Sequence, residues 1–221
     1  MPALKVSLER FVRGLIDLLL PQAPEVHFLE TTDASGLLQK ARPASKQLPE
    51  IISVFDYRDP LIKRLVWEIK FRGNRRLAKL AGAILYEHLL AELSELELFS
   101  GGSPVLIIPV PLAPKRLRER GFNQVERIVE EMKMIDGGKS FSISSSVVRV
   151  KETKSQTQTK SRNERIENMA GAFSVADKRS VEGRNIIVVD DVVTTGSTIG
   201  EIKKVLLKAG AREVRGLTLG H

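Results

Sequence analysis

The chain has 221 residues, no cysteine and a formal net charge of +8. The lack of cysteine excludes disulfides and any zinc site built on thiolates, and it fits a reducing, cytoplasmic environment. The positive charge favours anionic ligands such as nucleotides, pyrophosphate or nucleic acid, although an aromatic content of only 5% gives little support to binding of nucleic acid by base stacking.

Residues 4–20 are predicted to form an amphipathic helix, because their apolar residues recur at helical spacing. This stripe either packs on the core, which we favour, or binds a partner. The apolar run at 15–20 contains Asp17 and ends at Pro21, so it is too short to span a bilayer. We therefore expect a soluble protein with no membrane partner.

Residues 21–50 contain four prolines and mixed polarity, which indicate a loop-rich segment with a short strand from Val26 to Leu29. We expect residues 1–50 to form an N-terminal cap of helix and loop. Residues 51–221 would form the main domain.

The main domain begins with a predicted strand at 51–55, after which Asp59-Pro60 opens a helix. A turn at Gly73-Asn74 separates this helix from a long one that ends near Leu98. Four basic residues surround the turn, and they form either a solvated surface or a rim above an anion site: Lys70, Arg72, Arg75 and Arg76.

A buried strand is predicted at 105–110, where Pro109-Val110-Pro111 stops it abruptly. A basic run follows at 115–120, and an amphipathic helix then ends near Met134. Residues 147–165 are cationic, and their centre has no apolar residue to anchor it, so we expect a mobile loop.

The most informative stretch is 186–198, where four apolar residues, two acids and a hydroxyl-rich turn precede a helix that stops at Gly210. Acids at the carboxyl end of a buried strand lie where α/β sheets bind ligands. A turn at a helix N-terminus suits a phosphate. One molecule with a phosphate beside a diol is ribose 5-phosphate. Simple helix capping would explain only one acid and one hydroxyl.

All thirteen positions of 186–198 resemble the signature of type I phosphoribosyltransferases, which bind phosphoribosyl pyrophosphate (PRPP). The resemblance and the alternating strands and helices predict a three-layer α/β fold with a mostly parallel sheet of about five strands. The resemblance implies that Asp190 and Asp191 hold the ribose hydroxyls and, indirectly, Mg²⁺. The residues it assigns to the 5-phosphate are Thr194, Thr195, Gly196, Ser197 and Thr198.

The same resemblance places pyrophosphate at the loop after the first core strand. The residues in this place are Pro109, Val110, Pro111, Leu112, Lys115 and Arg116. The cationic segment 147–165 either is solvated surface or, as we favour, corresponds to the flexible hood that closes over PRPP. Its candidate catalytic residues are Lys151, Lys154 and Arg162.

Further motifs resemble the competence protein F (ComF) family over residues 51–221. They include Tyr57-Arg58-Asp59-Pro60, Arg120-Gly121-Phe122-Asn123-Gln124 and Gly171-Ala172-Phe173. Members are linked to DNA uptake in naturally transformable bacteria, which implies competence helicases or recombination-loading proteins as partners. Typical members carry an N-terminal zinc module of paired cysteines, and this chain has none.

Three functions therefore remain open. The first is a phosphoribosyltransferase that acts on an unidentified nucleophile. The second is a non-catalytic adaptor that binds PRPP or a nucleotide. Direct binding of single-stranded DNA through the basic loops is the weakest of the three.

Overall fold

The computed structural model describes residues 24–100, 105–151, 167 and 169–221. The predicted helix at 4–20 lies outside these residues. The described elements are α2 (Pro24–Thr31), α3 (Ala34–Lys40), β1 (Ile51–Phe55), α4 (Pro60–Trp67), the π-helix η1 (Glu68–Arg72), α5 (Arg75–Ser100), β2 (Val105–Pro109), α6 (Pro114–Arg120), α7 (Gln124–Asp136), β3 (Phe141–Ile143), β4 (Val147–Arg149), β5 (Phe173–Val175), β6 (Asn185–Val192), α9 (Ser197–Lys208) and β7 (Glu213–Gly220).

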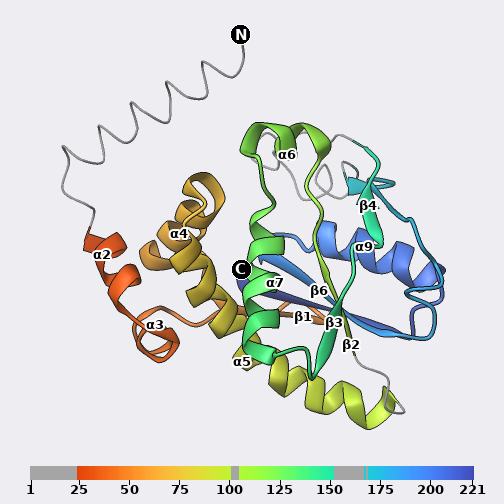
Figure 1. The fold of residues 1–221 in the computed structure, drawn as a ribbon, viewed down its shortest axis with the longest axis horizontal. Helices are drawn as coiled ribbons and strands as arrows, with labels where there is room; N and C mark the ends of the chain where they lie inside the picture. Colours follow the sequence, from red (N-terminus) through yellow and green to blue (C-terminus); the bar gives the residue numbers. More distant parts are fainter. Residues whose placement is uncertain (1–23, 101–104, 152–166, 168) are drawn as a thin grey trace.

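The centre of the fold is a five-stranded sheet with the order β1-β7-β6-β2-β3. Every neighbouring pair in it is parallel, which confirms the predicted sheet. Strands β4 and β5 form a separate antiparallel pair. Figure 1 shows β6 in the middle of the sheet, with α7 and α9 on opposite sides of it.

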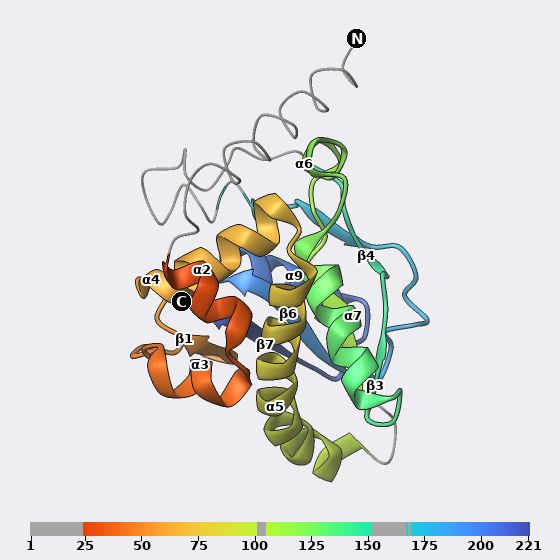
Figure 2. The same ribbon diagram turned by 60° about the vertical axis from the view of Figure 1, so that its left-hand side comes forward.

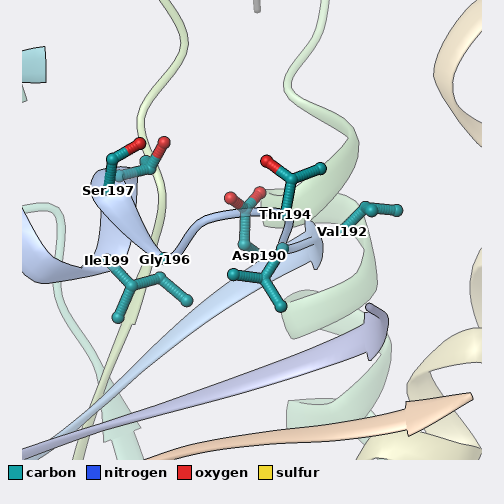
Figure 3. Close-up of a pocket in the computed structure, with 8 residues that line it drawn as sticks. Asp190, Val192, Thr194, Gly196, Ser197 and Ile199 are labelled. Atoms are coloured by element: carbon teal, nitrogen blue, oxygen red, sulfur yellow. The ribbon is translucent and has the colours of Figure 1, made fainter. Parts of the chain in front are cut away.

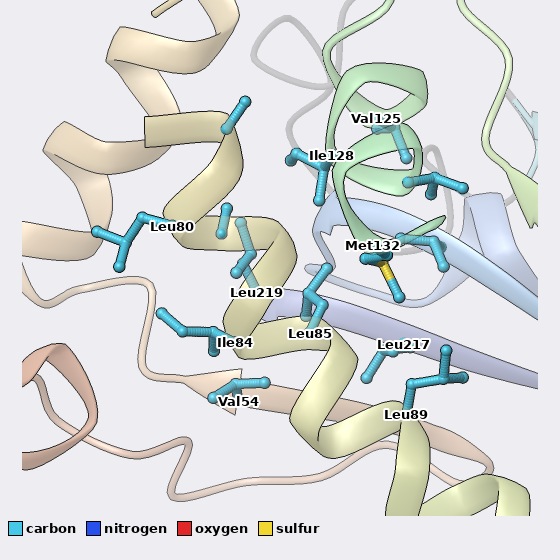
Figure 4. Packing of buried hydrophobic residues seen from close by; sticks show 14 of the residues in the cluster. Val54, Leu80, Ile84, Leu85, Leu89, Val125, Ile128, Met132, Leu217 and Leu219 are labelled. Carbon is cyan, nitrogen blue, oxygen red and sulfur yellow. The ribbon is translucent and has the colours of Figure 1, made fainter. Parts of the chain in front are cut away.

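Helices cover both faces of the sheet, as the three-layer prediction requires. Ile187 and Val189 of β6 join the cluster that contains the apolar side chains of α5 and α7. Ile186 and Val188 join the second cluster, which contains those of α9. This alternation is the period of two expected of a strand that is buried on both faces. Figure 4 shows the first cluster, in which α5 and α7 face each other above β7.

The predicted strand at 26–29 is wrong, because residues 24–31 form helix α2. Pro24 occupies the first helical turn, where a missing amide hydrogen costs nothing. Val26 and Leu29, three positions apart, are both buried on one face of this helix. A second helix, α3, begins after Asp33, whose side chain accepts a hydrogen bond from the Gly36 amide. The segment is therefore mostly helical up to residue 40.

The strand predicted at 51–55 and the two helices predicted after it are confirmed, with small shifts of the helix ends. Asp59 caps α4, and Gly73 adopts the left-handed conformation at the turn before α5. The basic run at 114–120, for which no helix was predicted, forms α6. Among the described residues, no helix combines the length and the apolar character needed to cross a membrane.

Gly82 of α5 lies against α7, and Gly200 of α9, which has open space around it, is a control for it. A methyl group at Gly82 would lie 2.8 Å from Cβ of Glu131 and 3.1 Å from the Ile128 carbonyl oxygen, whereas one at Gly200 in α9 would meet nothing. We expect Gly82→Ala to lower the free energy of unfolding by about 1–3 kcal/mol. Gly200→Ala should raise it by about 0.5–1 kcal/mol, because alanine favours helix.

Urea denaturation of both variants measures these two changes. If Gly82→Ala stabilised the protein as much as Gly200→Ala, the close approach of α5 and α7 would be contradicted.

Candidate functional site

The strand order creates a crevice between β2 and β6. From β2 the chain continues outward to β3, and from β6 it continues in the opposite direction to β7. The two strands pair directly, and Pro109 lies opposite Val189 near their carboxyl ends. Ligands of open α/β sheets bind at such a switch point, outside the carboxyl ends of the strands. The predicted site residues of β2 and β6 lie at this crevice.

Strand β6 continues through both acids to Val192, beyond the four apolar residues predicted for it. Asp190 and Val192 still pair with β7, and this pairing extends the strand. Asp190 lines the hollow beside the N-terminus of α9. Oδ2 of Asp191 instead accepts a hydrogen bond of 2.9 Å from the side-chain nitrogen Nε2 of Gln124, at the start of α7. The pleat therefore gives the two neighbouring carboxylates different surroundings.

Backbone hydrogen bonds hold both acids in place. The Asp191 amide donates to Oδ1 of Asp190 at 2.9 Å, and the Val192 amide donates to Oδ1 of Asp191 at 2.8 Å. Burial raises the pKa of Asp190 well above its ordinary value, and repulsion from Asp191 adds to this effect. Lys70 acts in the opposite direction. A ligand that offers hydroxyl donors or a cation would relieve the cost of ionising Asp190.

The loop between β6 and α9 encloses a hollow of about 180 Å³, part of which is open to solvent. In Figure 3 the carboxylate of Asp190 and the hydroxyls of Thr194 and Ser197 point to the same side of this loop, whereas Ile199 points away. Four of the five predicted phosphate residues line the hollow: Thr194, Gly196, Ser197 and Thr198. Thr195 does not line it, and its hydroxyl donates to Oγ of Ser197 at 3.0 Å.

Gly196 is required by the shape of this loop. Its φ is +77°, and a Cβ there would lie 3.2 Å from Cδ1 of Leu48. As the N-cap of α9 it offers no side chain to the first-turn amides, which suits a site that an anion completes. His221 contacts the carbonyl oxygens of Thr194 at 3.2 Å and Lys46 at 2.8 Å, and so it fixes the start of the loop.

The stretch predicted to bind pyrophosphate contains few available donors. Pro109 and Pro111 have no amide hydrogen, and the Val110 amide donates to the Val189 carbonyl at 2.9 Å. These three residues therefore offer no free amide to pyrophosphate, and they restrict the backbone conformation at the end of β2. Exposed Lys115 and partly buried Arg116, on the first turn of α6, are the cationic side chains of this predicted set.

Several cations converge on the acid pair. Burial lowers the pKa of Arg120 and of Arg149, and Arg116 adds repulsion to both. Asp191 opposes this shift at Arg120, and Asp190 opposes it at Arg149. Among the predicted hood residues, Lys151 is exposed next to β4. Lys154 and Arg162 lie outside the described residues.

Sequence reasoning missed the contact between Gln124 and Asp191. Gln124 also contacts Arg120, whose guanidinium donates a hydrogen bond to Oε1 of Gln124. Both residues belong to the Arg-Gly-Phe-Asn-Gln motif, which carried part of the family resemblance. In the same motif, Asn123 caps α7 through the Val125 amide and donates to the Val110 carbonyl oxygen at 3.0 Å. The motif therefore ties α7 to the ends of both β2 and β6.

The residues present fit a bound Mg²⁺ only in part. Within the described ranges, no group of three or more His, Cys, Asp or Glu side chains could enclose a metal ion. Mg²⁺ commonly binds through one or two carboxylates, water and the oxygens of a phosphate ligand. Asp190 and Asp191 are two carboxylates of this kind, and their indirect contact with Mg²⁺ stays a prediction.

The raised pKa of Asp190 predicts how stability depends on pH. Above its ordinary value of about 3.8, the unfolded chain ionises more readily than the folded protein, so stability falls as pH rises towards the folded pKa. Asp190→Asn removes the free-energy cost of ionising this buried carboxyl, and it keeps a side-chain oxygen that accepts the hydrogen bond from the Asp191 amide. We expect the variant to be more stable than the wild type at pH 7, and the difference to vanish below about pH 3.8.

Urea denaturation across this pH range measures the difference, with Glu87→Gln on the exposed face of α5 as the control. An Asp190→Asn variant that is no more stable at pH 7 would contradict the raised pKa.

Comparison with known proteins identifies the family of this chain. The model of the phosphoribosyl transferase domain matches residues 78–219. DNA utilization protein YhgH of Salmonella typhimurium is 37% identical over 180 residues, which cover 80% of this chain and 73% of that protein. Competence protein F of Haemophilus influenzae is 32% identical over 171 residues, with 75% of this chain and 70% of that protein covered.

A solved glutamine PRPP amidotransferase from B. subtilis has a TM-score of 0.39 at 18% identity, over 64% of this chain and 25% of that one. The domain match and the two relatives show that the chain belongs to the phosphoribosyl transferase domain family and, within it, to the group of YhgH and competence protein F.

Proposed function

We propose that the protein binds PRPP or ribose 5-phosphate together with Mg²⁺ in the crevice between β2 and β6. We further propose that it transfers the phosphoribosyl group to an acceptor and releases pyrophosphate. One observation carries this proposal: Asp190 and the hydroxyl-rich loop at the N-terminus of α9 line a single hollow, and Asp191 is the next residue of the same strand.

Each part of the crevice has a role in this proposal. The loop from Thr194 to Thr198 holds the 5-phosphate through amides, hydroxyls and the positive end of the α9 dipole. Asp190 accepts a hydrogen bond from a ribose hydroxyl. Asp191, held by Gln124, accepts one from the other hydroxyl. Arg116 and Lys115 lie on α6, after the end of β2, and bind the pyrophosphate.

In the transfer, the bond between ribose C1 and the pyrophosphate oxygen breaks, and the acceptor donates an electron pair to C1. Bound Mg²⁺ would neutralise charge on the leaving pyrophosphate. The protein holds the diol and the 5-phosphate fixed while the ring carries positive charge, as in other glycosyl chemistry. The carboxylates beside the ring stabilise that charge. Lys151, Lys154 and Arg162 are the proposed hood residues that exclude water.

The names of the relatives suggest the cellular setting. Proteins similar to this chain are called DNA utilization protein and competence protein, so we propose a cytoplasmic role in the handling of DNA taken up by the cell. Competence helicases and recombination-loading proteins would be its partners. A non-catalytic adaptor that only binds PRPP would use the same crevice, and turnover distinguishes the two.

Calorimetry tests the binding step. We expect PRPP and ribose 5-phosphate to bind in the presence of Mg²⁺. Asp190→Ala and Asp191→Ala should each weaken binding about tenfold or more, because each removes a charged hydrogen-bond acceptor. Glu130→Gln, on the exposed face of α7, is the matched control. No heat from either ligand, or full affinity in both aspartate variants, would overturn the proposal.

A pyrophosphate-release assay across bases and amines tests the transfer step. Release with any acceptor that Asp190→Ala abolishes would support the enzyme. Tight PRPP binding without release from any acceptor would instead support the adaptor.

A further inference from the structure

Two exposed aromatic rings lie side by side at the π-helix η1, although aromatic residues are scarce in the chain. Trp67 is 37% exposed and Phe71 is 49% exposed, and their ring centroids are 5.8 Å apart. We call this pair the aromatic shelf. Contiguous exposed apolar surface is a feature of binding sites, whereas exposed apolar residues that are scattered singly are ordinary.

Cations surround both rings of the shelf. The Trp67 ring has Arg64 at 4.9 Å and Arg72 at 5.2 Å from its centroid. The Phe71 ring has Arg120 at 5.4 Å and Lys70 at 5.9 Å. Such contacts are favourable because a cation is attracted to the face of an aromatic ring. Phe71 keeps the larger exposed fraction, so it offers the more open surface to a ligand.

A buried carboxylate preorganises the cations of the shelf before any ligand binds. Glu68 is 1% exposed, and its Oε1 lies 2.6 Å from Arg64 and 3.4 Å from Arg72. This carboxylate fixes the two arginines that flank Trp67. The π-helix places Trp67 and Phe71 on the same side of the turn, and π-helical turns occur often at functional sites. A ligand would therefore meet an ordered surface.

A short chain of contacts joins the shelf to the acid pair. Arg120, which lies over Phe71, donates to Gln124, and Gln124 donates to Asp191. On the other side, Lys70 favours the ionised form of Asp190. Arg127 of α7 also donates to the Gly73 carbonyl at 3.1 Å, which ties the turn after η1 to α7. Figure 2 shows α4, α6 and the beginnings of α5 and α7 at the same end of the molecule.

We propose that the shelf binds the acceptor, and that this acceptor is a planar heteroaromatic ring that carries a carboxylate. The ring stacks on Phe71 with Trp67 at its edge, and its carboxylate faces Arg120 and Lys70. Of the four cations, Arg64 and Arg72 pair with Glu68, whereas Lys70 and Arg120 interact electrostatically with the acid pair. A carboxylate on the ring would give Lys70 and Arg120 a direct ionic contact, which favours an anionic ring over a neutral one of the same shape. The inference rests on the proposed function, because it gives the crevice its second substrate.

The fluorescence of Trp67 tests this directly, because Trp67 is the only tryptophan in the chain. Nicotinate and nicotinamide are suitable probes, since they share a ring and differ by one charge, and orotate and uracil form a second pair. We expect saturable quenching by the anionic member of at least one pair, with about tenfold weaker binding of its neutral partner. The titration is done on the full chain with ribose 5-phosphate and Mg²⁺ present, and repeated without them.

Three variants locate the probe. Phe71→Leu keeps an apolar side chain and removes the stacking face, so it should weaken binding about tenfold. Arg120→Gln should reduce the preference for the anionic ring. Arg118→Gln, on the exposed side of the same helix, should change neither. Thermal melting shows whether each variant is folded.

The outcomes separate this inference from the proposed function. Quenching by the anionic ring without any calorimetric signal for ribose 5-phosphate would support the shelf and contradict the phosphoribosyl site. Binding of ribose 5-phosphate with no quenching by any ring, or equal quenching by charged and neutral rings, would overturn the shelf. Quenching by oligothymidylate alone, weakened steeply by salt, would assign the shelf to single-stranded nucleic acid and also overturn it.

Discussion

The pleat of β6 is the constraint on which the site depends. Successive side chains of a strand point to opposite faces, so two adjacent acids at the end of β6 reach different neighbours. One meets the loop before α9, and the other meets Gln124 of α7. Strand β6 lies between β7 and β2. The loop before α9 and Gln124 therefore both lie beside the crevice between β2 and β6, where the strand order reverses. A single strand thus places one acceptor beside the loop before α9 and the other beside α7.

Periodicity explains which parts of the fold were predictable. Apolar spacing and strong end signals placed β1, α4, α5, β2, β6 and α9, and the order of strand, acids, turn and helix located the crevice. Residues 24–31 were assigned wrongly because four prolines and mixed polarity in residues 21–50 indicated loop with a short strand, whereas Pro24 starts a helix. The role of Gln124 could not be predicted, since its partner Asp191 is 67 residues away and no local pattern records such a contact.

Part of the chain's excess positive charge lies around the acid pair. Arg116, Arg120, Arg149 and Lys70 come from α6, β4 and η1, and all act electrostatically on one another or on the acid pair. Without a ligand, the two carboxylates offset part of this repulsion. A doubly anionic phosphate or pyrophosphate would offset more of it, since such groups attract guanidinium and ammonium ions strongly. The same charges explain why an anionic acceptor suits the neighbouring shelf.

Shared residues also couple the crevice and the shelf. Arg120 contacts Phe71 and Gln124 at once, and Gln124 holds the carboxylate proposed to bind the ribose. A ligand on the shelf that draws Arg120 towards its own carboxylate would alter the donor beside Asp191. A ribose that binds Asp191 would in turn favour one position of Gln124 and therefore of Arg120. By linkage, each ligand must then change the affinity for the other by the same factor. Coupled binding of the two proposed ligands thus follows from one arginine placed between an aromatic ring and a side-chain amide.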